Sequence, residues 1–422
     1  MRRWAARRWS SRTGRSSGIR WCTWSPGGPP VARAWWGEGV PALRTVGVIG
    51  GGIVGACVAF HLARLGLRVH SIEAGEIGGG TTEASFARLS AFQQPTPTRF
   101  RISLAGIAEY RALARLVDLG PWWHRCGSLA WADDAGHEVH RGRVERMRGW
   151  GYQVHWREAG EVNQRLDPRI RFTGPGVPVA LLPEEGWVDA PGLAGALLSA
   201  AEGWYGLVRW RGRAESVVSG GGEVRAVRLA SGTELRVDAV VNAAGAGAEA
   251  LAAGVGAPML APTRRSGLVV DLRTDRAGPA SVLRGPDFHA RAAGPGRVRV
   301  RSDQVDLRLA DPPHYPEAPP QMLVEDLLER VRRSLPALTG AGVERVRIGT
   351  AVFPADGHPC VGAVSAVGGY YEALTNSGVT VGPLMGRLLA EFIATGHRPE
   401  LLADCRPDRL RAGNSATASA AE

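Results

Sequence analysis

A strand, a glycine turn, a helix and a second strand are predicted in succession from residue 45. Residues 45–49 are a short run rich in β-branched and apolar side chains, which is typical of a buried parallel strand. Apolar residues then recur at helical spacing, at Val54, Val58, Leu62 and Leu65. Gly66 supplies a helix stop, and residues 67–72 form a second apolar run that ends on Glu73.

Strands dominate the middle of the chain. Three of them, at 215–219, 223–230 and 233–241, are separated by short turns that contain glycine. The third alternates polar and apolar residues, becomes fully apolar and ends in a second glycine turn at 242–245. We interpret this stretch as a β-meander that returns into a parallel sheet. Residues 262–312 are expected to form further strands.

Three more helices are predicted by their patterns. Asp189 is a good N-cap for an Ala/Leu-rich helix that runs through Ala201. Residues 321–335 are amphipathic at helical spacing. The last helix is expected to begin near Val381, with Pro383 in its first turn, where proline is favoured.

The first glycine turn fits G-x-G-x-x-G on Gly50, Gly52 and Gly55. In that motif the first glycine allows a tight turn, the second lets a pyrophosphate approach, and the third lets helix and strand pack closely. The helix N-terminus offers free N–H groups to the pyrophosphate. Glu73, twenty-three residues after Gly50, can accept hydrogen bonds from an adenosine ribose. Together these features predict a dinucleotide-binding site.

The net charge of +11 does not indicate a nucleic-acid-binding protein once the charges are located. Nine arginines and a single acid fall in residues 1–45, and the rest of the chain carries a net charge of only +3. The tryptophans and arginines of that leader show no periodicity. We interpret residues 1–43 as a disordered or spurious extension, with initiation near Val40; a transit peptide is the alternative.

The remaining composition favours a cytoplasmic location. The five cysteines are odd in number and lack metal-ligand spacing, so free thiols and no metal site are expected. No run of about 18 apolar residues occurs, so no transmembrane segment is expected, and peripheral membrane contact is left open. The chain contains no lysine, which excludes Schiff-base and P-loop chemistry.

The order of motifs resembles the D-amino-acid oxidase superfamily of FAD-dependent oxidoreductases, which includes D-amino-acid dehydrogenase, glycine oxidase and sarcosine oxidase. Besides the first turn with Glu73, three segments carry the resemblance: 80–87 (GTTEASFA), 238–245 (DAVVNAAG), and the pair 356–362 and 376–380. It covers residues 44–398. It implies FAD, at Gly50, Gly52, Ile53, Val54, Gly55, Glu73, Ala74, Thr81, Thr82, Ser85, Phe86, Ala87, Ala214, Ala243, Ala244, Gly245, Asn376, Ser377, Gly378, Val379 and Thr380. Some members attach flavin through a cysteine, whose place here is Gly349 or close to it, so we expect non-covalent FAD.

The resemblance also implies the architecture. It predicts an α/β, Rossmann-like FAD-binding domain with a parallel sheet and a β-meander, and an α+β substrate domain with a mixed antiparallel sheet. The FAD-binding domain would be discontinuous. The expected boundaries are 44–95, 180–260 and 345–400 for the FAD-binding domain, 96–179 and 261–344 for the substrate domain, and 401–422 for a disordered tail.

The activity implied is oxidation of the C–N bond of an amine or amino acid, by hydride transfer to flavin N5, to an imine that hydrolyses. The electron acceptor would be O₂, a quinone or another compound. Where members of the family often carry an arginine for the substrate carboxylate, residues 349–353 have none. Nearby arginines that could replace it are Arg264, Arg265, Arg284, Arg291 and Arg347.

Candidate catalytic residues are His289, His358, Tyr370 and Asn376, although a structural role is open for each. Asn376 stands where many relatives have histidine, and it could donate to a flavin carbonyl. Two alternative functions remain: an FAD-dependent hydroxy-acid dehydrogenase, and a flavin-binding subunit of a heteromeric dehydrogenase.

Overall fold

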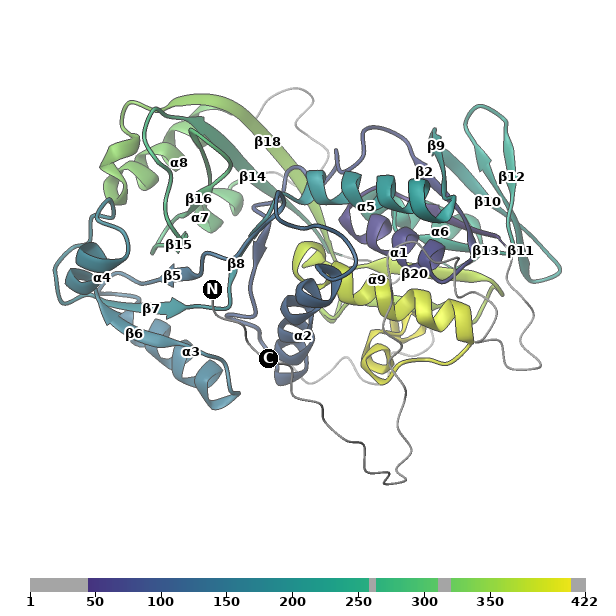
Figure 1. The fold of residues 1–422 in the computed structure, drawn as a ribbon, viewed down its shortest axis with the longest axis horizontal. Helices are drawn as coiled ribbons and strands as arrows, with labels where there is room; N and C mark the ends of the chain where they lie inside the picture. Colours follow the sequence, from purple (N-terminus) through teal and green to yellow (C-terminus); the bar gives the residue numbers. More distant parts are fainter. Residues whose placement is uncertain (1–44, 258–262, 310–319, 411–422) are drawn as a thin grey trace, which may run out of the picture. The chain divides into compact units, whose positions relative to one another are not determined.

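The computed structural model describes residues 45–257, 263–309 and 320–410 (Figure 1). A six-stranded sheet forms around the first predicted motif. Its order is β19-β20-β13-β1-β2-β9, and all neighbours are parallel except the edge pair β19–β20. The strands are β1 (Thr45–Ile49), β2 (Arg68–Glu73), β9 (Val208–Arg211), β13 (Ala239–Asn242), β19 (Cys360–Ala363) and β20 (Tyr370–Leu374).

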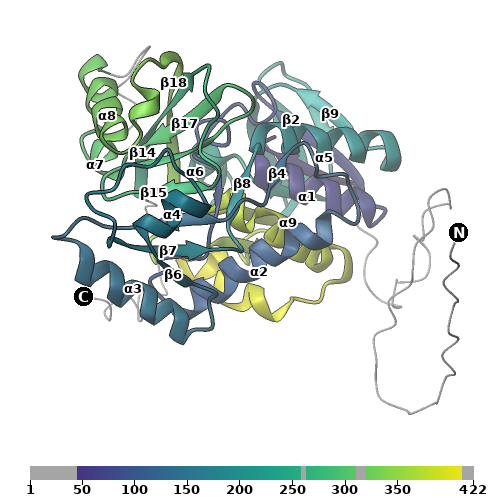
Figure 2. The ribbon, with the colours of Figure 1, turned by 60° about the vertical axis from the view of Figure 1, so that its left-hand side comes forward.

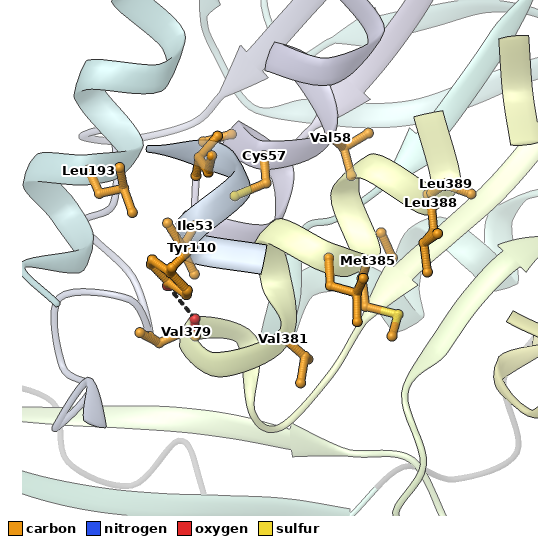
Figure 3. Close-up of a cluster of buried hydrophobic side chains, with 14 of the residues drawn as sticks. Ile53, Cys57, Val58, Tyr110, Leu193, Val379, Val381, Met385, Leu388 and Leu389 are labelled. Carbon is orange, nitrogen blue, oxygen red and sulfur yellow. Dashed lines mark hydrogen bonds between the residues drawn. The ribbon is translucent and has the colours of Figure 1, made fainter. Parts of the chain in front are cut away.

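Four helices pack beside this sheet and share its main hydrophobic core. They are α1 (Ile53–Arg64), α2 (Pro97–Leu113), α5 (Ala190–Tyr205) and α9 (Gly378–Thr395). Figure 3 shows the apolar side chains that α1, α2, α5 and α9 contribute, including Cys57, Tyr110 and Met385. The helices α1 and α9 cross closely: a Cβ at Gly386 would lie 2.7 Å from the Cys57 Cβ. This close crossing brings the N-termini of both helices to the same edge of the sheet.

A β-meander and a small sheet complete this half of the molecule. The meander is β10 (Ala214–Gly220), β11 (Glu223–Leu229) and β12 (Glu234–Arg236), all antiparallel. The small sheet has the order β3-β8-β4, from β3 (Arg88–Leu89), β8 (Gly186–Val188) and β4 (Trp123–His124). Two short helical segments, η1 (Gly245–Gly247) and α6 (Ala248–Gly254), follow β13.

An eight-stranded sheet forms the other half, with the order β18-β14-β17-β16-β15-β5-β7-β6. It is mixed, because β15 and β5 are parallel while its other neighbours are antiparallel. Its strands are β5 (Ser128–Ala130), β6 (His155–Glu158), β7 (Pro178–Leu182), β14 (Thr263–Arg273), β15 (Val282–Arg284), β16 (His289–Ala292), β17 (Arg297–Arg301) and β18 (Gly342–Phe353).

Helices accompany both ends of the eight-stranded sheet. In both views α3 (His137–Gly149) and α4 (Ala159–Arg165) lie beside β6 and β7 (Figures 1 and 2). At the other end lie α7 (Asp303–Asp306) and α8 (Gln321–Ser334), and η2 (Pro336–Leu338) follows α8 along the chain. The helix α8 buries an apolar stripe that includes Leu327 and Val331 in the second core, under β14 and β17.

The predicted fold class is confirmed, and several boundaries move. The third strand of the meander divides at residues 237–238, so that β12 stays in the meander while β13 joins the parallel sheet. The last helix begins at Gly378 rather than near Val381. The prediction that Pro383 lies in its first turn is therefore wrong, because Pro383 is the sixth helical residue.

Two predicted domain boundaries, 179/180 and 344/345, fall inside β7 and β18, which both belong to the eight-stranded sheet. The described residues all lie in one compact unit, Trp36–Glu422, so the division into two domains stays a prediction. The predicted disordered tail is wrong for its first part, where η3 (Glu400–Cys405) and η4 (Pro407–Leu410) bury Leu402, Cys405 and Leu410. The interpretation of residues 1–43, and that of residues 411–422, lie outside the described residues. Within the described part of the chain, none of the helices combines the length and apolar character that a membrane span requires.

Candidate cofactor and substrate site

Most of the predicted cofactor residues meet at one edge of the six-stranded sheet. The neighbouring strands β1, β2, β13 and β20 are parallel, so their carboxyl ends lie together. Ligands of open α/β sheets bind outside these ends. The segments that follow the four strands are residues 50–55, 73–74, 243–245 and 376–380.

The first glycine turn brings the backbone very close to its neighbours. Gly50 has a φ of +110°, and a Cβ there would lie 2.4 Å from the Ala243 carbonyl oxygen. A Cβ at Gly55 would lie 1.9 Å from the Gly50 carbonyl oxygen. At Gly52, in contrast, a Cβ would meet only the Thr82 hydroxyl, at 3.1 Å. Gly50 and Gly55 are therefore required by the fold itself, whereas Gly52 borders open space.

The first turn of α1 is suited to an anion. Its N-cap, Gly52, provides no capping side chain, and the turn contains no acid. The Ile53 N–H donates to the Thr82 hydroxyl at 3.1 Å, which places Thr82 of the second motif against the helix N-terminus. Free N–H groups and the helix dipole stabilise negative charge here. A pyrophosphate beside Gly52 fits this arrangement.

Glu73 turns back toward the glycine turn. Its Oε2 accepts from the Gly51 N–H at 2.6 Å, and its Oε1 accepts from the Gly75 N–H at 2.8 Å. The Gly212 N–H donates to the Glu73 carbonyl oxygen at 2.8 Å, which brings the segment before Ala214 to the same corner. The carboxylate thus lies beside the turn, where an adenosine ribose could reach it, and the ribose contact stays a prediction.

The segment 80–87 is held by arginines from the eight-stranded sheet. Arg299 of β17 donates to the carbonyl oxygens of Glu83 and Ser85, at 3.0 and 2.9 Å. Arg291 of β16 donates to the Phe86 carbonyl oxygen at 2.6 Å. These contacts tie the two sheets together through the segment that the resemblance assigns to the flavin.

A buried carboxylate, Asp271 on β14, balances this positive charge. It accepts hydrogen bonds from the Nε and Nη2 groups of Arg299, at 2.7 and 2.8 Å, and from the Nη1 group of Arg347 at 2.7 Å. Although burial alone would raise the pKa of Asp271, its hydrogen bonds and its attraction to the two arginines lower it. Arg347 also pairs with Glu83 at 2.7 Å. Because Arg347 is engaged in this network, it is not available for a substrate carboxylate.

The N-terminus of α9 lies beside that of α1, because a Cβ at Gly378 would lie 3.0 Å from the Val54 side chain. Its N-cap, Ser377, makes no capping hydrogen bond, and its first turn has no acid. Inside that turn, the Tyr110 hydroxyl donates to the Val379 carbonyl oxygen at 2.5 Å (Figure 3). The Thr380 hydroxyl donates to the Arg88 carbonyl oxygen at 3.2 Å. These bonds orient a second open helix N-terminus next to the segment 80–90, as stabilisation of a reduced flavin would require.

Tyr370 and His358, two of the candidate catalytic residues, lie in different surroundings, and a catalytic role for either stays a prediction. Tyr370 is fully buried in the core under the meander, and its hydroxyl accepts a hydrogen bond from the Asn242 side chain at 2.8 Å. His358 lies in the turn before β19, and burial lowers its pKa. Asn376 accepts a hydrogen bond from Arg99 at 3.3 Å. Of these three, only Asn376 lies in the segment that leads into the N-terminus of α9.

His289 lies in a different environment, on the face of the eight-stranded sheet next to Phe86. The two rings are 5.7 Å apart in an edge-to-face arrangement. The His289 Nε2 is 3.1 Å from the Asp303 Oδ2, and the side chain of Arg284, directly across the hairpin, lies 4.0 Å from the same oxygen. This group stands beside the segment 80–87 and belongs to the candidate substrate side.

Sequence reasoning missed Arg99, Arg299 and Asp271, which hold the site together. Their contacts join residues far apart along the chain: Arg299 reaches Ser85 across 214 positions, and Arg99 reaches Asn376 across 277. No local spacing could reveal such pairs. The composition gave one signal, because charged residues inside apolar strands such as β14 and β17 must find partners when buried.

Comparison with known proteins agrees with this geometry. Residues 45–392 match the family described as FAD dependent oxidoreductase. Among curated proteins, a glycine oxidase from Geobacillus kaustophilus is 29% identical over 164 residues, 37% of this chain and 43% of that protein. A 4-methylaminobutanoate oxidase (formaldehyde-forming) from Paenarthrobacter nicotinovorans is 26% identical over 84% of this chain. The chain spans 44% of that second protein, so it aligns with less than half of either relative.

The fold is also found among solved structures. The crystal structure of the glycine oxidase from Geobacillus kaustophilus has a TM-score of 0.76, with 23% identity, and covers 86% of this chain and 98% of its own. The residues described above fit FAD: open space at Gly52, two uncapped helix N-termini and an acid beside the glycine turn. The chain belongs to the family of FAD-dependent oxidoreductases.

Proposed function

We propose that this protein uses FAD to oxidise the C–N bond of an amine or amino acid. The proposed product is an imine, which water then hydrolyses. The observation that carries the proposal is the match to this family across residues 45–392. Two relatives are named glycine oxidase and 4-methylaminobutanoate oxidase (formaldehyde-forming), and both names are those of oxidases of an amino compound, which favours a C–N bond here.

The residues of the site would hold the cofactor and stabilise its negative charge. FAD supplies the redox chemistry, by accepting a hydride from the substrate carbon. The turn 50–55 and Glu73 would hold its adenosine diphosphate part, and the N-termini of α1 and α9 would stabilise negative charge. We expect non-covalent FAD, because Gly349 stands where a flavin-linking cysteine would be, and a Cβ there would lie 2.6 Å from the Ala84 Cβ.

The electron acceptor and the compartment are part of the same proposal. The proposed electron acceptor is O₂ or a quinone. A quinone is included because no lysine is present to activate oxygen. A cytoplasmic location agrees with the four free cysteines among the described residues, Cys57, Cys126, Cys360 and Cys405.

The test is anaerobic reduction of the purified, full-length yellow protein by D-, L- and N-methyl amino acids and by simple amines. Bleaching of the flavin absorbance by one of these supports the proposal, and readmission of O₂ or addition of a quinone then identifies the acceptor. Bleaching by 2-hydroxy acids alone would overturn it in favour of a hydroxy-acid dehydrogenase. A protein that none of these compounds reduces would overturn it in favour of a flavin-binding subunit.

A further inference from the structure

One face of α2 supports the beginning of α9. Arg99, Gly106 and Tyr110 are seven and four residues apart along α2, so they lie on the same face of the helix. The Tyr110 hydroxyl donates to the Val379 carbonyl oxygen at 2.5 Å (Figure 3), and a Cβ at Gly106 would lie 2.5 Å from the Thr380 carbonyl oxygen. The two helices are therefore in close contact exactly where α9 begins, and Arg99 extends this face beyond the end of α9.

The guanidinium group of Arg99 contacts both segments of the C-terminal motif pair. Its Nη2 donates to the Asn376 Oδ1 at 3.3 Å. Its Nη1 lies against the backbone of Gly357, because a Cβ at that glycine would lie 2.8 Å from it. Arg99 thus joins residues 356–362 to residues 376–380, two segments that lie next to each other only in the folded chain.

The positive charge of Arg99 is not paired with a carboxylate among the described residues. Asp356 is near enough to act on Arg99 electrostatically, but both of its oxygens are bound by Arg409, at 2.6 and 3.0 Å. An arginine stays protonated at neutral pH. Within the described part of the chain, Asn376 is the one hydrogen-bond acceptor of the Arg99 side chain.

This contact fixes the orientation of the Asn376 amide. A guanidinium group can only donate, so the amide presents its carbonyl oxygen to Arg99 and directs its nitrogen away from it. Asn376 is half-buried, and its Nδ2 makes no hydrogen bond within the described residues. The next residue, Ser377, is the N-cap of α9 and makes no capping hydrogen bond. The amide N–H groups therefore lie beside the free backbone N–H groups of a helix N-terminus.

We propose that Arg99 is a positioning residue for FAD: it holds the Asn376 carbonyl oxygen so that the amide N–H groups can donate to a carbonyl oxygen of the flavin. Donors fixed in this way stabilise the negative charge of the reduced ring more than the neutral oxidised ring, so they raise the reduction potential of the bound FAD. The inference concerns the cofactor of this family and goes beyond the proposed function, because it holds for any substrate.

The test is the midpoint potential of FAD in the full-length protein, measured by equilibration with redox dyes of known potential. Arg99→Met keeps a side chain of similar length and removes the donors. It should lower the preference of the site for reduced over oxidised FAD about tenfold, which corresponds to about 30 mV for a two-electron couple. Arg101→Met is the matched control, because Arg101 is exposed on the same helix, and it should leave the potential unchanged.

A double variant tests whether Arg99 acts through Asn376. Asn376→Ala removes the amide itself and should lower the potential at least as much as Arg99→Met does. If the arginine only orients the amide, the variant that carries both substitutions should have the same potential as Asn376→Ala alone. A decrease equal to the sum of the two single effects would show that Arg99 acts by its own charge, and would overturn the positioning role.

The same variants distinguish positioning from a purely structural contact. A structural contact would lower the stability in urea, or weaken oxidised and reduced FAD equally, and the potential would stay as in the wild-type protein; that result would overturn the proposal. If Arg99→Met does not fold, Asn376→Ala alone decides, and an unchanged potential would again overturn it. None of these measurements uses a substrate, so their failure would leave the proposed oxidation of a C–N bond standing.

Discussion

Two regions of the molecule contact the segment 80–87, and they do so in opposite ways. One is the glycine turn between β1 and α1, and the other is the arginine-bearing face of the eight-stranded sheet. The turn works through the absence of side chains: Gly50 and Gly55 let backbone atoms approach, and Gly52 leaves space for a ligand. The sheet face works through long charged side chains. Arg291 and Arg299 reach across to the carbonyl oxygens of residues 83–86.

This difference decides how each region responds to change. A steric requirement is local and absolute, because the backbone cannot move away from an added methyl group. A charge network is distributed, and removing one member strands the others in a region of low dielectric. Four substitutions can separate these two kinds of requirement, and they are ordered below by the size of the expected effect.

Gly55→Ala should have the largest effect, a loss of stability of about 4 kcal/mol or more. The added Cβ would overlap the Gly50 carbonyl oxygen. Because α1 lies so close to the turn, neither group has room to move away. Circular dichroism and thermal unfolding of the purified protein provide the measurement.

Gly52→Ala is the matched control for Gly55→Ala. Its Cβ meets only the Thr82 hydroxyl, so stability should change by less than about 1 kcal/mol while the affinity for FAD falls at least tenfold. Equal destabilisation by the two alanines would contradict the distinction between a fold glycine and a ligand glycine.

The same distinction between local steric requirements and distributed charge contacts explains how much of the structure could be predicted from the sequence. The motif of residues 45–73 was predicted to within a residue or two, because it depends on period, glycine spacing and one acid within a single short segment. The start of α9 was misplaced because Gly378, Val379 and Thr380 were interpreted as a loop, although the helix begins directly after Ser377. Glycine is a poor helix former, and here its use is to let α9 pack on α1: a Cβ at Gly378 would lie 3.0 Å from the Val54 side chain.

Asp271→Asn should destabilise the protein by about 3 kcal/mol, because it leaves Arg299 and Arg347 without their shared carboxylate in a buried place. Since Arg299 holds the segment 83–85, FAD should also dissociate more readily. Urea unfolding and the fraction of bound flavin after gel filtration measure both effects. Glu344→Gln, which breaks an exposed pair with Arg297, should leave the free energy of unfolding nearly unchanged. If the two substitutions lower the free energy of unfolding equally, the buried network does not stabilise this face of the eight-stranded sheet.

The network itself was beyond sequence reasoning, whereas the Arg284–His289 pair was within reach. Gly285, Pro286 and Asp287 are residues that favour a turn, and two short strands flank them. A hairpin there places Arg284 opposite His289, as the register shows. What the sequence could not supply is which carboxylate each arginine of this face pairs with, because that depends on the positions of Asp271, Asp303 and Asp306 in three dimensions.

Glu73→Ala should weaken FAD by about 1–3 kcal/mol, the loss expected when a charged hydrogen-bond acceptor is removed. The side chain accepts from the Gly51 and Gly75 N–H groups, so part of the loss reflects a less ordered turn. Equilibrium titration of the apoprotein with FAD measures the change. Glu76→Ala removes a neighbouring acid whose side chain is exposed and should leave the affinity unchanged. An unaltered affinity in Glu73→Ala would show that the ribose assignment is mistaken.

His61→Leu tests an unfavourable buried group in α1. This group is the polar ring of His61, which has no hydrogen-bond partner among the described residues. Both ring nitrogens of His61 are buried and make no hydrogen bond within the described residues. Burial, then the charges of Arg64 and Arg387, lower its pKa well below the usual value. Replacing the ring with an apolar side chain of similar size should therefore stabilise the protein at neutral pH by about 1 kcal/mol.

The pH dependence gives this prediction its sign. Because the pKa of His61 is lower in the folded than in the unfolded chain, the unfolded chain binds more protons below about pH 6.5, and stability falls as the pH decreases. His61→Leu should make that fall shallower when urea unfolding is followed from pH 7.5 to pH 5. Part of the fall should remain, since the pKa values of His140 and His289 are lowered to about 4 and 3 by burial. His397→Gln, at an exposed site, should not alter the slope. If His61→Leu leaves the slope as steep as in the wild-type protein, the ring has a proton or a partner in the folded state, and α1 contains no such unfavourable buried group.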